Sequence, residues 1–312
     1  MKKIKLLLGL FLATILFVVA CNPEPQNVSD APETTEQASS TQESSLSVTP
    51  FYASAKGALV ASTMIEGESE MILVDAQYIP SEATKLVEKV KAKGKDLKAI
   101  WISHGHPDHY LALSTVLEAF PDTPVYATAE CVEVMNQRTA TYVESAKNNP
   151  GFADEEIPDN PIIAEVFTED SMELDGETIE IMDMVGDTKN VGALYIPSLK
   201  TLIATDVVYS GVHVFMIESN TPEVRQAWMS SLDTIKELNL EKLIPGHKAP
   251  DVSLDDPTAL VDNMAKYIET YGGAVTSKGN VEEAKAEITT AFPDYQVPFL
   301  LDISLNAAYA NQ

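Results

Sequence analysis

The amino-acid sequence predicts a layered α/β or α+β domain, and three observations lead to this expectation. Short apolar runs that are typical of strands recur along the chain. Longer segments whose apolar residues repeat with helical spacing lie between these runs. The chain has 312 residues and is 45% hydrophobic, which is enough for one sizeable buried core or two small ones. Strands and helices mixed in this way are expected to pack as layers.

The predicted elements follow from the length and spacing of the apolar runs. Strands end near turn or charged residues, whereas helices are longer and have one apolar face. Strands are expected at residues 57–64, 71–75, 98–103, 123–128, 178–184, 191–197, 201–206 and 241–245. Helices are expected at residues 81–94, 110–120, 129–147, 222–239 and 257–271. Residues 148–170 are rich in Pro, Asp and Glu and are expected to form a long loop.

The N-terminus has the pattern of a targeting segment. Residues 2–5 carry three lysines, and the apolar stretch that follows, residues 6–20, is too short for a comfortable membrane span. This predicts a signal peptide over residues 1–20. The stretch ends in VVAC, which resembles the bacterial lipobox, and Cys21 would then be the lipidated first residue of a mature lipoprotein. The alternative is an uncleaved anchor helix, and both place the protein in the bacterial cell envelope, on the outer side of the cytoplasmic membrane.

The next segment lacks the residues that a folded core requires. Residues 22–50 contain Ser, Thr, Pro, Gln and acidic residues, but no basic residue and almost nothing large and apolar. We therefore expect residues 21–50 to be a disordered tether and residues 51–312 to form the folded domain.

The chain is strongly acidic, with a formal net charge of −26. Such a charge repels nucleic acid and anionic lipid head groups, so neither is an expected partner of the folded domain. The acidity is expected to contribute to solubility, and it does not identify a substrate.

The most informative motif is HGHPDH at residues 104–109, directly after the apolar run 99–102. Two histidines spaced by one residue can turn toward one point where a strand opens into a loop. Asp108 stands where a helix N-cap belongs, so His109 would lie at the entrance of the next helix. Because imidazole and carboxylate groups are the usual nitrogen and oxygen ligands of zinc, the motif predicts a metal site.

This His-x-His-x-Asp-His motif after a strand resembles the signature of the metallo-β-lactamase superfamily. The resemblance covers about residues 55–270 and implies a single-domain, four-layer αββα sandwich with one or two metals at the sheet edges. It also implies ligands at later strand ends, where the runs at 201–205 and 242–246 end in Asp206 and His247. One position departs from the pattern, because Asp187 stands where the family usually has histidine.

The resemblance divides the ligands into two sets. The first metal would be held by His104, His106 and Asp187, the second by Asp108, His109 and His247, and Asp206 would bridge them. Zn²⁺ is the expected metal, in two copies, and Asp187 makes Mn²⁺ or Fe²⁺ an alternative because it adds a harder oxygen ligand. Aspartate is shorter than histidine, so Asp187 could instead reach the metal only through a water and leave the first site weak or empty.

The expected chemistry is hydrolysis. Two metals can share a water, lower its pKa and polarise a carbonyl or phosphoryl oxygen, so that the metal-bound hydroxide becomes the nucleophile. Asp108 is expected to orient this water and take its proton. His213 is assigned either a substrate-contacting or oxyanion role or a loop-fixing hydrogen bond. Asp75 is expected to orient the motif loop rather than bind metal.

We therefore expect a metal-dependent hydrolase of an ester, thioester, lactone or amide in a small molecule. Cleavage of a β-lactam is less favoured because the β-lactamases of this family do not usually carry aspartate at the position of Asp187. A redox enzyme similar to the flavodiiron proteins is disfavoured, since His106 replaces their glutamate and no flavin-binding segment follows. The remaining alternative is a degenerate surface lipoprotein with a binding or structural role. The loop at residues 148–170 would either shape the substrate pocket or cover the surface.

Overall fold

The computed structural model describes residues 44–159 and 161–310. The predicted signal peptide, Cys21 and most of the predicted tether lie outside these residues. Strand β1, Ser47–Tyr52, pairs antiparallel with β2, Ala61–Glu66. The folded domain therefore begins before residue 51, where it was predicted to start, because the buried side chains of Leu46 and Val48 pack in its core. Among the described residues, no helix has the length and apolar character that crossing a membrane requires.

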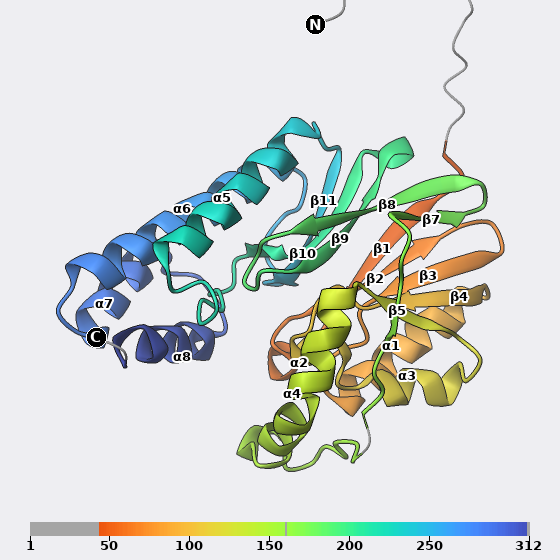
Figure 1. Cartoon of the computed structure of the whole chain (residues 1–312), viewed down its shortest axis with the longest axis horizontal. Coiled ribbons are helices and arrows are strands. Elements are labelled where there is room, and N and C mark those ends of the chain that lie inside the picture. Colours follow the sequence, from red (N-terminus) through yellow and green to blue (C-terminus); the bar gives the residue numbers. More distant parts are fainter. Residues whose placement is uncertain (1–43, 160, 311–312) are drawn as a thin grey trace, which may run out of the picture. The chain divides into compact units, whose positions relative to one another are not determined.

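Two β-sheets form the centre of the folded domain (Figure 1). The first sheet has the order β1-β2-β3-β4-β5-β6, and the second has the order β11-β10-β9-β8-β7. The other strands of the first sheet are β3 (Glu70–Val74), β4 (Asp96–Trp101), β5 (Val125–Ala127) and β6 (Glu165–Val166). Those of the second are β7 (Ser171–Leu174), β8 (Glu177–Met184), β9 (Val191–Ile196), β10 (Thr201–Ser210) and β11 (Lys242–Lys248).

Helices cover the outer face of each sheet. Helices α1 (Pro80–Ala92), α2 (Pro107–Tyr110), α3 (Leu113–Ala119) and α4 (Ala129–Lys147) belong to the first half of the domain. Helices α5 (Pro222–Glu237), α6 (Pro257–Ser277), α7 (Val281–Ala291) and α8 (Pro298–Tyr309) belong to the second half.

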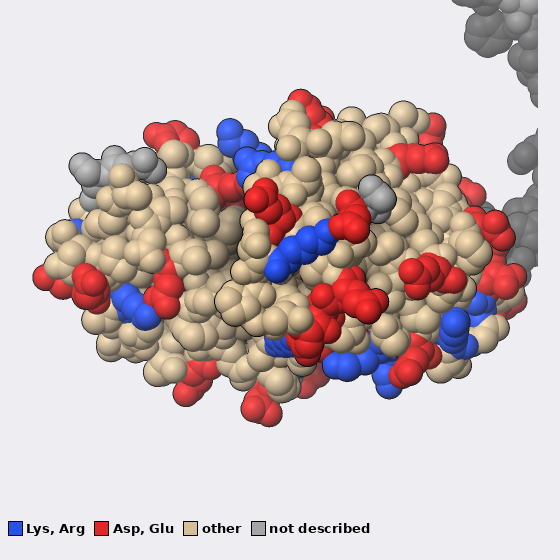
Figure 2. All heavy atoms as spheres, turned by 90° about the horizontal axis from the view of Figure 1, so that it is seen from below, with Lys and Arg blue, Asp and Glu red and all other residues tan. Residues whose placement is uncertain are grey.

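Three apolar cores hold these layers together. Between the sheets, Ile72 and Trp101 of the first sheet share a core with Leu194 and Ile203 of the second. A second core joins the first sheet to α1, α3 and α4, and a third joins the second sheet to α5, α6, α7 and α8. This arrangement is the four-layer αββα sandwich expected from the sequence, in a single folded unit. On the face seen in Figure 2, acidic side chains are spread widely and basic side chains lie among them.

The structure adds elements that the sequence pattern did not predict. Strand β6 has two residues, and both are exposed, so it carries no apolar alternation that could have predicted it. Helices α7 and α8 both lie beyond residue 270, where the family resemblance ends. Of these, α8 contributes most to the site, because it lines the cavity described below.

Candidate metal centre

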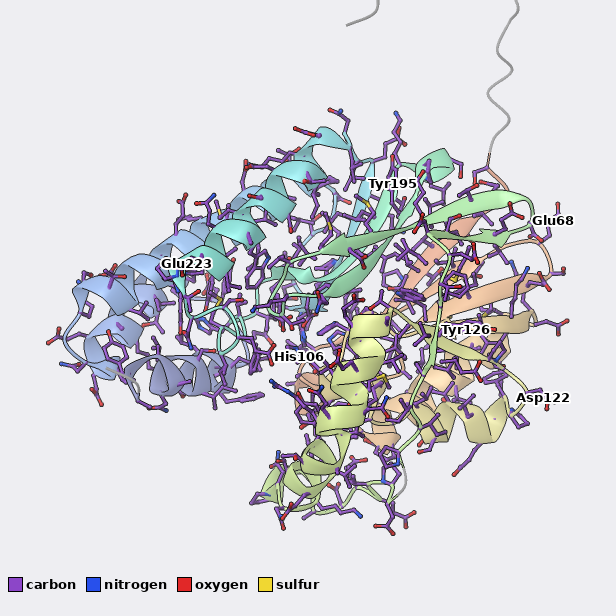
Figure 3. The ribbon with its side chains drawn as sticks, in the orientation of Figure 1. Glu68, His106, Asp122, Tyr126, Tyr195 and Glu223 are labelled. Carbon is purple, nitrogen blue, oxygen red and sulfur yellow. The ribbon has the colours of Figure 1, made fainter. Side chains whose placement is uncertain are left out.

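The HGHPDH motif lies where the chain leaves the first sheet. Strand β4 ends at Trp101, and α2 begins at Pro107 with His106 as its N-cap residue. Asp108 is therefore in the first turn of α2 and is not the N-cap that we predicted, because the proline occupies the first helical position, which it favours. Its carboxylate is directed at His247 instead, with Oδ2 3.3 Å from Nε2. Figure 3 shows His106 beside α4, well away from the β2–β3 turn that carries Glu68.

The second sheet brings Asp206 and His247 to the motif through neighbouring strands. Strands β10 and β11 run parallel, and their register shifts on both sides of Thr205. Thr205 has a φ of 44°, which is unfavourable for a β-branched residue, and strain of this kind is common at functional sites. Gly246 is required here, since a Cβ would overlap Oδ1 of Asp206 and lie 2.6 Å from the carbonyl carbon of Thr205.

The first metal-ligand group consists of His104, His106, Asp187 and Asp206. Their candidate ligand atoms all lie within 4.8 Å of one another. Nδ1 of His106 is 3.0 Å from Oδ2 of Asp187. Nε2 of His104 lies 3.8 Å from Oδ1 of Asp187 and 3.6 Å from Oδ2 of Asp206. All four side chains are buried, so little of this group's surface is exposed to bulk water.

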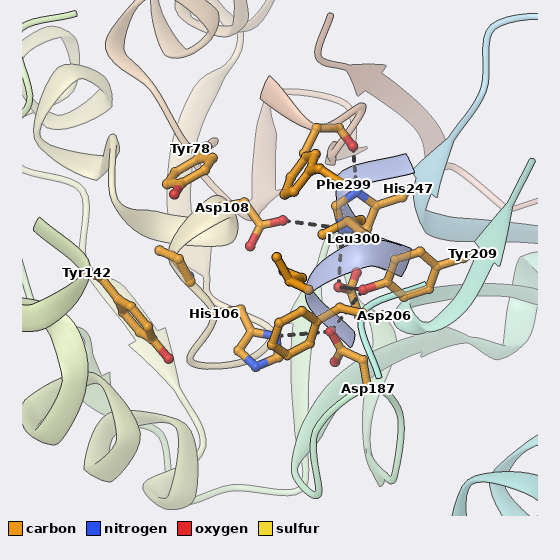
Figure 4. Close-up of a pocket in the computed structure, with 14 residues that line it drawn as sticks. Tyr78, His106, Asp108, Tyr142, Asp187, Asp206, Tyr209, His247, Phe299 and Leu300 are labelled. Carbon is orange, nitrogen blue, oxygen red and sulfur yellow. Dashed lines mark hydrogen bonds and ion pairs between the residues drawn. The ribbon is translucent and has the colours of Figure 1, made fainter. Parts of the chain in front are cut away.

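The second metal-ligand group consists of Asp108, His109 and His247, whose ligand atoms also lie within 4.8 Å of one another. Asp206 contacts this group as well: its Oδ1 is 3.3 Å from Nε2 of His109, and its Oδ2 is 3.2 Å from Nε2 of His247. Asp206 thus lies between the two groups, where the bridging ligand was expected. Figure 4 shows Asp108, Asp206 and His247 meeting at this point.

The donor atoms fit divalent metal ions. Oδ1 of Asp187, Oδ1 of Asp206 and Nε2 of His109 are buried and have no hydrogen-bond partner within the described part of the chain. Buried polar atoms of a native protein normally have a partner, and a cation would supply it. Imidazole nitrogens and carboxylate oxygens are also the donor types that zinc accepts.

Asp75 orients histidines of both groups. Its carboxylate accepts hydrogen bonds from the backbone N–H of Ser103 at 2.8 Å and from Nδ1 of His109 at 2.7 Å. It also accepts a hydrogen bond from the Ser103 hydroxyl at 2.8 Å, and the oxygen of this hydroxyl lies 3.0 Å from Nδ1 of His104. These contacts are the ones that an orienting role for Asp75 requires, and the role itself stays a prediction. His247 is oriented differently, because its Nδ1 donates to the Ala58 carbonyl at 2.8 Å.

Tyr209 also lies in the site, although sequence analysis did not identify it. Its hydroxyl is 2.6 Å from Oδ2 of Asp206 and 2.9 Å from Oδ2 of Asp187, and its ring stacks on His247. Regular strand alternation would point residues three apart to opposite faces. The irregular register of β10 between Thr205 and Tyr209 brings the two side chains together, and no sequence pattern predicts this irregularity.

Glu218 is the other residue that sequence analysis missed. It accepts hydrogen bonds from Thr188 at 2.8 Å and Arg138 at 2.7 Å, and its Oε1 lies 3.6 Å from Nε2 of His106. It lies in the connection between β10 and α5, where neither a motif nor a periodic pattern distinguishes it from other acidic residues.

Burial and mutual charge shift the pKa values of the cluster in different directions. Burial raises the pKa of Asp187 to about 6, and the nearby Asp206 adds to this rise while His106 opposes it. Burial lowers the pKa of His247, but Asp206 and Asp108 outweigh it and raise the pKa to about 10. Burial, Asp187 and Asp206 raise the pKa of Tyr209 well above its usual value, so its hydroxyl remains a donor. Because ligands must lose their protons to bind metal, protons and metal ions compete for this cluster.

The structure does not support a catalytic role for His213. Its Nδ1 lies 3.0 Å from the Tyr267 hydroxyl, and its backbone N–H donates to the Gln296 carbonyl at 2.9 Å. Its ring packs against Tyr267 and Tyr295, and it is not among the described residues that line the cavity. The loop-fixing hydrogen bond, which was the alternative interpretation, agrees with this position.

A cavity of about 170 Å³ opens beside the two metal-ligand groups (Figure 4). Its lining includes His106, Asp108 and His247 together with Phe299 of α8. None of the described residues between 148 and 170 lines it. Phe152 and Ile157 of this segment pack into a small core with Ile79. Phe152 also lies edge-on against Tyr78, which lines the cavity, so the described part of the segment supports the pocket through Tyr78 without lining it itself.

Comparison with known proteins agrees with this fold. A model described as the metallo-beta-lactamase superfamily matches residues 56–247. The uncharacterized protein YobT of Bacillus subtilis (strain 168) is 34% identical over 62 residues, which are 20% of this chain and 26% of that protein, so the chain spans about a quarter of this relative.

Solved structures resemble the whole domain. A metallo-beta-lactamase family protein from Thermus thermophilus matches with a TM-score of 0.59 and 17% identity, over 86% of this chain and 93% of that one. The inverting sec-alkylsulfatase Pisa1 from Pseudomonas sp. matches with a TM-score of 0.56 and 15% identity, over 84% of this chain and 48% of that one. At these identities the likeness shows a common fold.

Proposed function

This chain belongs to the metallo-β-lactamase superfamily, and we propose that it is a metal-dependent hydrolase of an ester, thioester, lactone or amide in a small molecule. The observation that carries the proposal is the convergence of two groups of histidines and aspartates on Asp206, beside a cavity, with all of these residues buried except the partly buried Asp108. Several of their ligand atoms have no hydrogen-bond partner within the described part of the chain, and each group combines residues that follow β4 of the first sheet with residues of the second sheet. Such an arrangement is costly unless it binds something.

Zinc is the metal that we propose for both groups, because the donors are imidazole and carboxylate. Asp187 in the first group makes manganese or iron the alternative there. Divalent ions bound at these groups would activate a water and polarise the carbonyl of a substrate.

Asp108 is the residue that we propose as proton acceptor. It lines the cavity, and its Oδ2 lies 3.3 Å from Nε2 of His247 and 3.8 Å from Nε2 of His109. Burial raises its pKa, but His109 and His247 outweigh burial and hold the pKa of Asp108 below its usual range. Its carboxylate is therefore ionised near neutral pH and can orient a water and accept its proton.

Metal analysis combined with a substrate panel tests this proposal. The metal-loaded protein is assayed with chromogenic ester, thioester, lactone, phosphodiester and β-lactam substrates, with His106→Ala as the control. We expect two equivalents of metal and turnover of at least one carbonyl substrate, which His106→Ala abolishes or strongly reduces. Protein that binds no metal and turns over none of the panel would support the alternative of a degenerate site with a binding or structural role.

We also propose that the protein is a lipoprotein anchored through Cys21 and exposed outside the cytoplasmic membrane. The support comes from the basic start, the short apolar stretch and the VVAC sequence at residues 1–21. Metabolic labelling with an alkyne fatty acid in a bacterial host tests it. The wild type should be labelled and found with membranes, whereas Cys21→Ser should be unlabelled. Equal labelling of both proteins would contradict the anchor.

A further inference from the structure

The lining of the cavity beside the metal-ligand groups is of two kinds. The candidate ligands form its polar part. The large apolar and aromatic residues, which we call the apolar wall, are Tyr78, Tyr142, Phe215, Phe299, Leu300 and Ile303. These residues come from segments far apart in the sequence, and α8 supplies three of them. Figure 4 shows Tyr78, Tyr142 and Phe299 around the ligand residues.

The described residues place no lysine or arginine side chain in the lining of this cavity. Arg138, one turn before Tyr142 on α4, has its Nη1 2.7 Å from Oε1 of Glu218, so its charge is already compensated. A carboxylate, phosphate or sulfate remote from the reacting bond would therefore find no side chain to pair with it.

Exposed apolar side chains mark the rim of the cavity. Phe299 and Ile303 are 50% and 38% exposed, lie one turn apart on α8, and both line the cavity. Within the described part of the chain, the only other large hydrophobic side chains with such exposure are Val166 and Ile217. Adjacent exposed apolar side chains beside a concave site are typical of ligand binding.

On the basis of the hydrolase function proposed above, we propose that the substrate is a neutral ester, thioester or lactone that carries an apolar chain. The chain lies against the apolar wall and leaves the cavity across Phe299 and Ile303. An apolar cavity of about 150 Å³ holds a benzene molecule. The cavity here is of similar size, about 170 Å³, so its enclosed part takes on the order of six heavy atoms of the chain.

A series of chain lengths tests this substrate class. The full chain, loaded with zinc, is assayed with p-nitrophenyl alkanoates from acetate to decanoate and with alkyl acetates of increasing length, so that both sides of the ester are covered. A fully buried methylene contributes up to about fourfold in binding. We expect kcat/KM to rise at least tenfold from two to six carbons in one series and then to level off. Flat profiles in both series would overturn the proposal.

An anionic series tests the requirement for a neutral chain. Mono-p-nitrophenyl esters of dicarboxylic acids match the alkanoates in length but end in a carboxylate. We expect kcat/KM at least tenfold below that of the neutral ester of equal length, and Ile303→Lys should narrow this difference. Equal rates for the neutral and the anionic esters would overturn the proposal.

A matched pair of variants assigns the preference to the apolar wall. Phe299→Ala should lower the preference for hexanoate over acetate about fivefold. Val166→Ala is the control, since Val166 has 46% exposure on β6 and lies outside the cavity lining. Both positions are exposed enough for the variants to fold. A Phe299→Ala protein with the wild-type preference would contradict the role of the wall.

A binding measurement separates this inference from the proposed hydrolysis. Nile red, a neutral dye, is bound to the protein and displaced by 2-octanone, a neutral ketone that cannot be hydrolysed. We expect displacement in the wild type and in Val166→Ala, at concentrations about fivefold lower than in Phe299→Ala. If 2-octanone binds in this way but no ester is turned over, the hydrolase function fails and the apolar binding site remains. If 2-octanone does not bind, the apolar site fails whether or not esters are hydrolysed.

Discussion

The two metal-ligand groups differ in how firmly the protein orients them. In the second group, His109 donates to Asp75 at 2.7 Å and His247 donates to the Ala58 carbonyl at 2.8 Å. In the first group, Nε2 of His106 has no hydrogen-bond partner in the described part of the chain. Oδ2 of Asp187 is shared with Tyr209 and His106. Outer contacts of metal ligands raise affinity, so we expect the second group to bind metal more tightly than the first.

The largest effect is expected from Asp206→Ala, which removes the ligand that both groups share. Each group would lose an oxygen donor and leave buried imidazoles facing one another. We expect metal content below half an equivalent, measured by inductively coupled plasma mass spectrometry, and a fall in kcat/KM of about 10³-fold or more, in the range found for losing central catalytic groups. Asp251→Ala, an exposed aspartate, is the control. If Asp206→Ala keeps one tightly bound metal, the bridging position is wrong.

A smaller effect is expected from Asp75→Asn, which changes the residue that orients His109 directly and His104 through Ser103. An orienting partner typically contributes about 10-fold to 100-fold in metal affinity. Competition with a chromogenic chelator should show a loss of metal affinity in this range. The loss should be larger for the second group, which is expected to bind metal more tightly, because Asp75 contacts its His109 directly. Equal weakening of both sites would mean that the contact through Ser103 matters as much as the direct one.

The smallest effect is expected from Asp187→His, which makes the first group resemble the family pattern. Loss of one negative charge makes this group more positive, so the pKa of the water that it activates falls. The alkaline-rising limb of the pH–rate profile should move to lower pH, and the metal affinity of the first group should rise because imidazole is a usual zinc ligand. An unchanged or upward-moved limb would count against Asp187 as a ligand.

How far the site could be predicted depended on where its signals lie in the sequence. His104, His106, Asp108 and His109 fall within six consecutive residues, which form a recognisable motif. Asp206 and His247 each come directly after an apolar run, so they also have a local pattern. Asp187 has no such local pattern and follows only from the family resemblance, in which it stands where histidine is usual. His213 follows Asp206 closely in the sequence, but its contacts are with Tyr267 and Tyr295, which agrees with the loop-fixing alternative rather than with a catalytic role.

The sequence by itself determined the layered fold and the motif that predicts metal binding, because apolar periodicity and ligand spacing are local properties. Only the tertiary structure decided that Tyr209 joins the two aspartates, that the Ala58 carbonyl orients His247, and that α8 completes the cavity. These contacts depend on a register shift, a backbone atom and a helix far along the chain. None of them leaves a periodic or spaced pattern in the sequence, because each arises from how distant segments pack.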